Sequence, residues 1–415
     1  MISRRALVVT LAVISFLAAC SSSEEGVAPA STSTVSLPVS STAVSTTDVS
    51  STTAISTTIP VTVTPTTVRP VQEPLPNPEL FDAAIRLHTL DAGSRDVSVA
   101  VVYDGQVIHS YAASSRKSSR AVDEQTSFRI ASISKILTAV TVLKLVEQGQ
   151  LELDEPIVGR VADNIGLMLA DSRARDISVK QLLAHTSGIS NFLEIFFDIG
   201  AYDQMSMLSE TLGQSLSTEP GSAYKYSNVN YVLLGKAIEL VTGLSYHDAV
   251  EQLVLAPLGL QSFRLVGTYE FGPSDALHAV SGGRTYMEQL GAAGAWVATA
   301  IDVAKMVDSI NADSPTLHIL NADLMKLMKA PATPKPVTPI WDYGLGLRLF
   351  VSGEWGHSGS IENVHSMAVH RPDGLVVAVL VNGSKPKETD DLIGAINDAV
   401  LAARTGVVAT TTIAP

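Results

Sequence analysis

The sequence predicts an α/β fold of the α+β type, in which an antiparallel sheet is flanked by terminal helices and carries an inserted α-rich domain. Two β-rich hairpins turn at Asp-Gly, one at residues 104–105 and one at residues 373–374. The stretch between them, about residues 155–290, is mostly helical and loop-like. Because strands and a helix come from both ends of this region, we expect them to close one sheet.

The predicted elements follow in order along the chain. Residues 78–87 have the helical spacing of apolar residues, and residues 97–111 form the first hairpin. Residues 367–381 form the second hairpin, and residues 388–404 have the pattern of an amphipathic helix. The cleft between the sheet and the α-rich part is therefore the first place to look for a site.

The composition excludes several classes of function. The chain has 415 residues, with 28 Lys+Arg against 41 Asp+Glu, a net charge of −13 and one cysteine. An acidic chain lacks the basic face that nucleic acid requires. One cysteine excludes an internal disulfide and a cysteine-based metal cluster, and no H-E-x-x-H occurs. We expect no cofactor and no metal, and the sequence indicates no protein partner.

The N-terminus has the pattern of an export signal. Arg4 and Arg5 precede an apolar run of about fourteen residues, 6–19, too short for the roughly 30 Å core of a membrane. We therefore expect residues 1–19 to be a signal peptide. The end of the run, Leu17-Ala18-Ala19-Cys20, resembles the bacterial lipobox, which implies lipid on Cys20 and a place on the outer face of the cell membrane. The alternative is an ordinary secretory signal with an incidental cysteine.

The next segment predicts a tether. Residues 21–68 are about half Ser and Thr, with almost no charge, so they bury too little apolar surface to offset chain entropy. We expect disorder over residues 20–75 and again over the tail, 405–415. The folded part is then 76–404, with an α/β lobe formed by 76–154 and 291–404 and an α-rich lobe formed by 155–290.

Ser132 and Lys135 predict a nucleophile and its base. They are three residues apart at the start of a strongly apolar helix, so they share a face of its first turn. A lysine among apolar neighbours loses proton affinity and can accept the serine proton. The pattern S-x-x-K also occurs at Ser114 and Lys117, but there the surroundings are polar and predict a solvated loop. The context therefore selects Ser132.

Two further elements carry polar groups suited to acyl transfer. Tyr226 and Asn228 precede an apolar run; a phenol near a lysine can pass a proton to a leaving group, and a carboxamide can hold a substrate amide. His357, Gly359 and Ser360 lie in a Gly-rich strand beside the last hairpin. The glycine lets a ligand lie against the strand, and the Ser360 N–H can complete an oxyanion hole with that of Ser132.

The order S-x-x-K, Y-x-N, H-x-G resembles the penicillin-recognising serine hydrolases: class C β-lactamases, D-Ala-D-Ala carboxypeptidases, D-aminopeptidases and related esterases. Residues 182–189 and 294–304 also look like stretches common in that family. The resemblance covers about residues 76–404 and implies a β-lactamase/transpeptidase-like fold. It further implies that Ser132 forms an acyl-enzyme with help from Lys135, that Tyr226 exchanges the proton, and that Asn228 orients the acyl amide.

His357 is the main departure from the family pattern, because it stands in place of the lysine of K-T-G beside the substrate carboxylate. The resemblance implies a cation whose charge depends on pH, so that acylation falls as pH rises through the pKa of His357. This puts efficient β-lactam hydrolysis in doubt. Among the other polar residues, His185 is expected to anchor a loop, and Trp341 and Tyr343 to line the cleft or to pack.

The leading hypothesis is an exported, lipid-anchored serine hydrolase that acts through an acyl-enzyme on a D-amino-acid peptide or related amide. Its substrate would be a small molecule or a fragment derived from peptidoglycan. Two alternatives stay open: an esterase or weak β-lactamase with the same machinery, and a catalytically silent scaffold that binds wall fragments.

Overall fold

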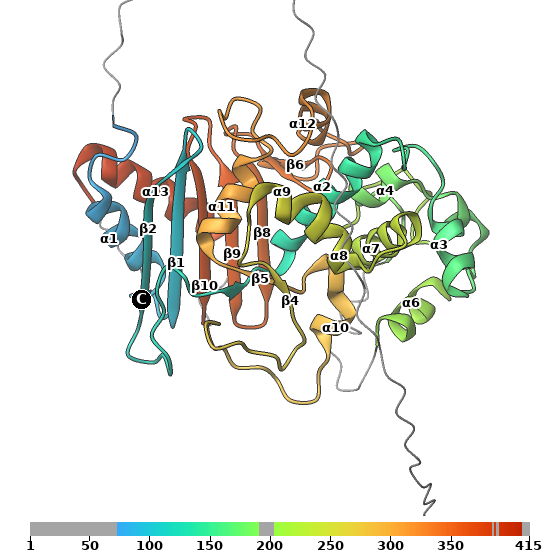
Figure 1. The fold of residues 1–415 in the computed structure, drawn as a ribbon, viewed down its shortest axis with the longest axis horizontal. Helices are drawn as coiled ribbons and strands as arrows, with labels where there is room; N and C mark the ends of the chain where they lie inside the picture. Colours follow the sequence, from blue (N-terminus) through green and yellow to red (C-terminus); the bar gives the residue numbers. More distant parts are fainter. Residues whose placement is uncertain (1–72, 191–202, 384–385, 387–389, 409–415) are drawn as a thin grey trace, which may run out of the picture. The chain divides into compact units, whose positions relative to one another are not determined.

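A seven-stranded antiparallel sheet, in the order β2-β1-β10-β9-β8-β7-β6, organises the protein (Figure 1). The computed structural model describes residues 73–190, 203–383, 386 and 390–408. The strands of the large sheet are β1 (Asp96–Tyr103), β2 (Gln106–Ser114), β6 (Trp341–Tyr343), β7 (Arg348–Phe350), β8 (Trp355–Ile361), β9 (Val364–His370) and β10 (Val376–Asn382). A smaller sheet has the order β3-β5-β4, from β3 (Phe128–Arg129), β4 (Arg264–Leu265) and β5 (Trp296–Ala298).

The two predicted hairpins form and lie next to each other in the sheet. The first turns at Asp104 and Gly105, whose φ angles of 49° and 72° are those of a tight type I′ turn. β1 then pairs along its length with β10, with Val99 opposite Val379. Segments from the two ends of the folded region thus close one antiparallel sheet, and the predicted fold class is confirmed.

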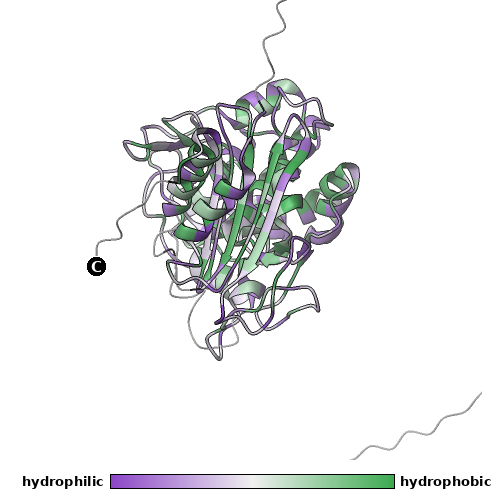
Figure 2. Ribbon diagram, turned by 90° about the vertical axis from the view of Figure 1, so that its left-hand side faces the viewer, coloured by the Kyte–Doolittle hydropathy of each residue, from purple (hydrophilic) through white to green (hydrophobic). Residues whose placement is uncertain are grey.

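Apolar residues on β1 and β10 alternate between two cores, one on each face of the sheet. Val97, Val99 and Val101 pack with α1 (Pro78–His88) and α13 (Asp391–Thr405). The intervening Ala100 and Val102 belong to the larger core on the other face. That core takes in α2 (Ser134–Glu147) and α11 (Ala300–Asp308), and Figure 2 shows the hydrophobic strands between these helical layers.

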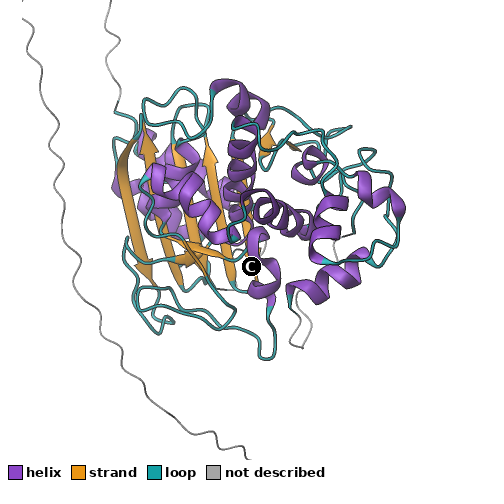
Figure 3. Cartoon of the chain, turned by 45° about the vertical axis from the view of Figure 1, so that its right-hand side comes forward, coloured by secondary structure: helices purple, strands orange, loops and turns teal. Residues whose placement is uncertain are grey.

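The α-rich stretch lies beside the sheet and within the same compact unit, as Figure 3 shows. Its longest described helix is α7 (Asn228–Thr242), which is buried over most of its length. The other helices of this stretch are α3 (Val158–Ile165), α4 (Val179–Leu183), α6 (Gln204–Leu212), α8 (Tyr246–Val250), α9 (Ala256–Leu258) and α10 (Tyr286–Leu290). Shorter helical turns are η1 (Ala131–Ile133), η2 (Ser172–Asp176), η3 (Glu251–Leu255) and η4 (Gly291–Ala293), and α12 (Ala322–Met328) follows further along the chain.

The structure adds elements that the sequence pattern did not predict. β6 and β7, and all three strands of the smaller sheet, are two or three residues long, too short for a periodic pattern. The last helix spans Asp391–Thr405 and is capped by a left-handed Gly406, as expected for a C-terminal cap; residues 387–389, where the predicted helix begins, lie outside the described residues. Among the described residues, no helix is long and apolar enough to cross a membrane. The predicted signal peptide, Cys20, residues 20–72 of the tether and the tail from 409 lie outside the described residues.

Candidate active site

Ser132 lies in η1, the tight turn that leads into α2. The residue before it, Ala131, has φ 48°, a left-handed conformation that is strained for a residue with a side chain. The Ile130 carbonyl just upstream accepts a hydrogen bond from Ser366 Oγ on β9 at 2.8 Å. The turn that presents Ser132 is therefore held against the sheet.

Lys135 is fully buried one turn after Ser132. Its Nζ donates to Asn228 Oδ1 at 2.8 Å and to the Ala293 carbonyl at 2.8 Å, and it lies 3.1 Å from Ser132 Oγ. Burial, together with the positive charge of Arg348, holds the pKa of Lys135 well below its usual range. In the described surroundings no carboxylate contacts Nζ to offset this effect, so Lys135 gives up its proton more readily than an exposed lysine.

Once Lys135 has lost its proton, the three contacts of its Nζ determine where its proton-accepting electron pair points. A neutral amine has two N–H bonds and one lone pair. The two carbonyl oxygens, of Asn228 and Ala293, accept only and take both N–H bonds. The lone pair is then left for the hydroxyl hydrogen of Ser132, which is the geometry that a general base requires.

Tyr226 lies in the loop before α7 and donates its hydroxyl to Ser132 Oγ at 3.0 Å. Burial raises the pKa of Tyr226 to about 12, so the side chain is a neutral phenol at neutral pH. Its ring packs against His185, with centroids 4.3 Å apart, and His185 Nδ1 accepts from the Ser227 N–H at 3.2 Å. His185 therefore anchors the loop that carries Tyr226.

Asn228 is the first residue of α7, and its carboxamide oxygen is engaged by Lys135. The lining of the cavity described next does not include Asn228. The hydrogen bond from Lys135 shows that Asn228 also positions the proposed base, Lys135. The role of orienting a substrate amide stays a prediction.

A cavity of about 260 Å³ opens onto Ser132 and Tyr226. The predicted residues His357, Gly359 and Ser360 line it, all from β8. The remaining lining residues are Arg348, Ser358 and Asp390. In the described part of the chain, β7 pairs with Trp355 and Gly356, at the start of β8, and this pairing does not extend to the residues of β8 that line the cavity.

His357 is not the cation that the resemblance implied. It is 1% exposed, and burial together with Arg348 and Lys135 holds its pKa well below the usual range. Nδ1 faces the Ser358 carbonyl and so carries the hydrogen, which leaves Nε2 to accept from the Tyr343 hydroxyl at 2.9 Å. At neutral pH His357 is thus a neutral, fixed ring in the wall, and it does not supply positive charge.

Arg348 supplies the charge instead, and the sequence interpretation missed it. Its guanidinium lines the cavity, stacks at 4.6 Å over the ring of Trp341 and pairs with Asp390. Its Nε is buried without a hydrogen-bond partner among the described residues. One signal was available: Arg348 is the only Lys or Arg between Lys335 and Arg371.

Gly359 is needed for a reason beyond the one expected. A Cβ there would lie 2.5 Å from the Ile130 carbonyl oxygen and 2.9 Å from Ala131 Cβ. These atoms belong to the turn that holds Ser132. The absence of a side chain at Gly359 therefore lets this turn pack closely against β8. Gly359 also lines the cavity, and its expected place beside a bound ligand stays a prediction.

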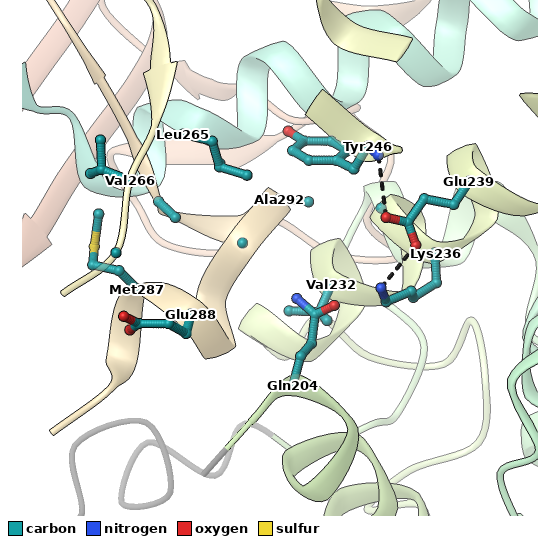
Figure 4. A pocket seen from close by; sticks show the side chains of 14 residues that line it. Gln204, Val232, Lys236, Glu239, Tyr246, Leu265, Val266, Met287, Glu288 and Ala292 are labelled. Atoms are coloured by element: carbon teal, nitrogen blue, oxygen red, sulfur yellow. Dashed lines mark hydrogen bonds and ion pairs between the residues drawn. The ribbon is translucent and has the colours of Figure 1, made fainter. Parts of the chain in front are cut away.

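A second pocket, of about 310 Å³, lies elsewhere, between α7, α10 and β4 (Figure 4). Its polar lining includes the ion pair of Lys236 with Glu239, at 2.8 Å. It also includes Glu288, whose carboxylate accepts hydrogen bonds from the N–H and the hydroxyl of Thr268. No nucleophile with an adjacent base lines it. Within the described part of the chain, no cluster of His, Cys, Asp or Glu has the arrangement of a metal site.

Comparisons with curated proteins identify hydrolases and penicillin-binding proteins. The chain is 27% identical over 374 residues to esterase EstB of Burkholderia gladioli, covering 78% of this chain and 94% of the esterase. It is 32% identical over 188 residues to penicillin-binding protein 4 of Amycolatopsis lactamdurans, covering 44% of this chain and 46% of that protein.

Solved structures agree on the fold. D-amino acid amidase from Ochrobactrum anthropi SV3 aligns with a TM-score of 0.64 and 25% identity over 79% of this chain and 100% of the amidase. The penicillin-binding protein homologue from Pyrococcus abyssi aligns with a TM-score of 0.66 and 24% identity, over 79% and 77%. Residues 81–401 match the Beta-lactamase family. The chain therefore belongs to the Beta-lactamase family and is a serine hydrolase related to penicillin-binding proteins, esterases and D-amino acid amidases.

Proposed function

We propose that this serine hydrolase cleaves a D-amino-acid peptide or related amide that ends in a carboxylate, as a D-Ala-D-Ala carboxypeptidase does. The observation that carries the proposal is the presence of Arg348 in the same cavity as Ser132. A guanidinium is the preferred protein partner of a carboxylate, because it offers parallel N–H bonds and a permanent charge. The small cavity suits a substrate end of one or two residues.

The reaction follows from the contacts of Ser132. Its Oγ attacks the substrate carbonyl while Lys135 takes the hydroxyl proton, and the tetrahedral oxyanion is met by the N–H groups of Ser132 and Ser360. As the bond to the leaving nitrogen breaks, Tyr226 gives that nitrogen a proton and regains one from Lys135. Water then attacks the acyl-enzyme by the reverse route, which releases the acid and restores Ser132.

The alternative substrate class is an ester. The relative that supports it is esterase EstB, which matches over 94% of its own length. The same three groups would hydrolyse an ester with less demand on Tyr226, because an alkoxide or phenolate leaves more readily than an amine. Efficient β-lactam hydrolysis is not proposed, since the position of the family lysine holds the neutral His357.

An Arg348→Met variant separates these readings. Paired peptides that end in D-Ala-D-Ala, one with a free C-terminal carboxylate and one with a carboxamide, are compared by kcat/KM. We expect the wild type to prefer the acid, and the variant to lose about tenfold to 100-fold on the acid and little on the amide. Arg348→Lys should recover part of the loss. Hydrolysis of nitrophenyl esters without turnover of either peptide would reject the peptide substrate in favour of the esterase.

We further propose that the protein is exported and anchored by lipid on Cys20, with residues 20–75 as a spacer. The lipobox-like Leu17-Ala18-Ala19-Cys20 and the Ser/Thr-rich composition that follows support this. In a bacterial host fed an alkyne fatty acid, the wild type should take up the label and sediment with membranes. Cys20→Ser should do neither, whereas Ser21→Ala should behave as wild type. Membrane-free, unlabelled wild-type protein would refute the anchor.

A further inference from the structure

Arg348 is not free in the cavity, because Asp390 already occupies one edge of its guanidinium. Arg348 Nη1 donates to Asp390 Oδ1, and both residues line the cavity with Ser132. The central carbon of the guanidinium lies over the ring of Trp341, 4.6 Å from its centroid. A carboxylate from the protein itself therefore sits where the proposed substrate carboxylate must bind.

The direction of the Asp390 side chain is not explained by the helix that follows it. Asp390 is the N-cap residue of α13, a position where aspartate ordinarily accepts a hydrogen bond from the first turn. Here the side chain makes no capping hydrogen bond. It turns to Arg348 instead, while remaining 45% exposed against 19% for Arg348. The exposed carboxylate can thus be displaced, whereas the arginine stays in the wall.

We propose that Asp390 is a specificity-determining residue that competes with the substrate carboxylate for Arg348. In its presence the cavity holds a neutral ion pair and accepts uncharged amides and esters without loss. An anionic substrate must first displace Asp390 and then bind beside its negative charge, which costs affinity. This inference rests on the proposed function for its substrate, but it concerns only the balance between charged and uncharged leaving groups.

The test uses thioester depsipeptides, because an activated ester reports on any serine hydrolase even if no peptide is cleaved. Two substrates differ only in the end of the leaving group, which is a free carboxylate in one and a carboxamide in the other. The readout is the ratio of their kcat/KM values, acid over amide, in the full-length protein. Asp390→Asn, which remains a good N-cap, should raise this ratio about fivefold to tenfold, chiefly through KM for the acid.

Two controls isolate the cause. Asp391→Asn removes the same charge from the next residue, in the first turn of α13 and outside the cavity lining, so it should change the ratio less than twofold. In an Arg348→Met background, Asp390→Asn should raise the ratio by clearly less than in the wild-type background, because the competition for Arg348 is gone and only the repulsion between the two carboxylates remains. Asp390→Ser offers a second variant with a capping side chain should the Asn variant fold poorly.

An unchanged ratio in Asp390→Asn and Asp390→Ser would overturn the inference. The ion pair of Arg348 with Asp390 would then only stabilise the start of α13. An equal rise in Asp391→Asn would overturn it as well, since the effect would then be one of overall charge. Failure of the peptide proposal looks different: the depsipeptides are hydrolysed and the ratio responds to Asp390, but D-peptides are not cleaved.

Discussion

Replacing Lys135 by methionine is expected to lower kcat by about 10³-fold to 10⁴-fold, as loss of a general base does, with little change in KM. Methionine keeps the length and most of the volume of lysine but has no proton acceptor. Lys144→Met, on the same helix, is the matched control: Lys144 Nζ pairs with Glu147 at 2.6 Å, outside the cavity lining, and the variant should keep its activity within about threefold.

The same variant reports on the charge of Lys135 through the pH dependence of stability. The folded protein holds the pKa of Lys135 well below its usual range, so between that lowered pKa and about pH 10 the unfolded chain binds a proton that the native state does not. Burial of Lys135 therefore costs stability, and the cost shrinks by about 1.4 kcal/mol for each unit that pH rises towards the unfolded pKa. Urea unfolding at pH 7 and pH 9 should show this extra gain in the wild type and in Lys144→Met, but not in Lys135→Met. Equal slopes in all three would mean that the native state keeps Lys135 protonated from pH 7 to pH 9, which would remove it as a neutral base in that range.

Replacing Ser132 by alanine should lower kcat by at least about 10⁴-fold, the largest effect expected of any single substitution, because no covalent route remains. The turn should keep its shape, since its anchor is the Ile130 carbonyl bonded to Ser366. Ser114→Ala is the control, because Ser114 and Lys117 share the S-x-x-K spacing. Ser114 is the half-buried last residue of β2, not part of the predicted solvated loop; it donates to Asp96 at 2.7 Å and lies outside the cavity lining. That control should retain full activity. Comparable losses in both variants would point to a nucleophile elsewhere.

Much of the fold was predictable because it is encoded locally. The Asp104-Gly105 turn needs positive φ at both residues, and the flanking β-branched runs predict strands. Pairing of β1 with β10 followed only from the need to close one sheet. The short strands β6 and β7 were not predictable, because two or three residues carry no period and are held by their neighbours in the sheet.

In the candidate site, too, the locally encoded features were predictable and those that depend on tertiary structure were not. Ser132 and Lys135 are neighbours on one helical turn, so their contact follows from spacing, and the structure brings Tyr226 to the same oxygen. The charge of the cavity depends on tertiary placement. Burial makes His357 neutral, and the β6–β7 hairpin brings Arg348 into the cavity from a segment with no catalytic motif.

In the proposed mechanism Ser132 forms a covalent acyl-enzyme, which mass spectrometry of the protein detects directly. The full-length protein is mixed with a slowly deacylating acyl donor, a fluorescent penicillin or an activated depsipeptide, then quenched in acid and weighed intact and as peptides. We expect an added acyl mass on the peptide that contains Ser132, present in the wild type and in Ser114→Ala and absent from Ser132→Ala. Catalytic turnover of the donor with no adduct at any time, or an adduct that persists in Ser132→Ala, would contradict it.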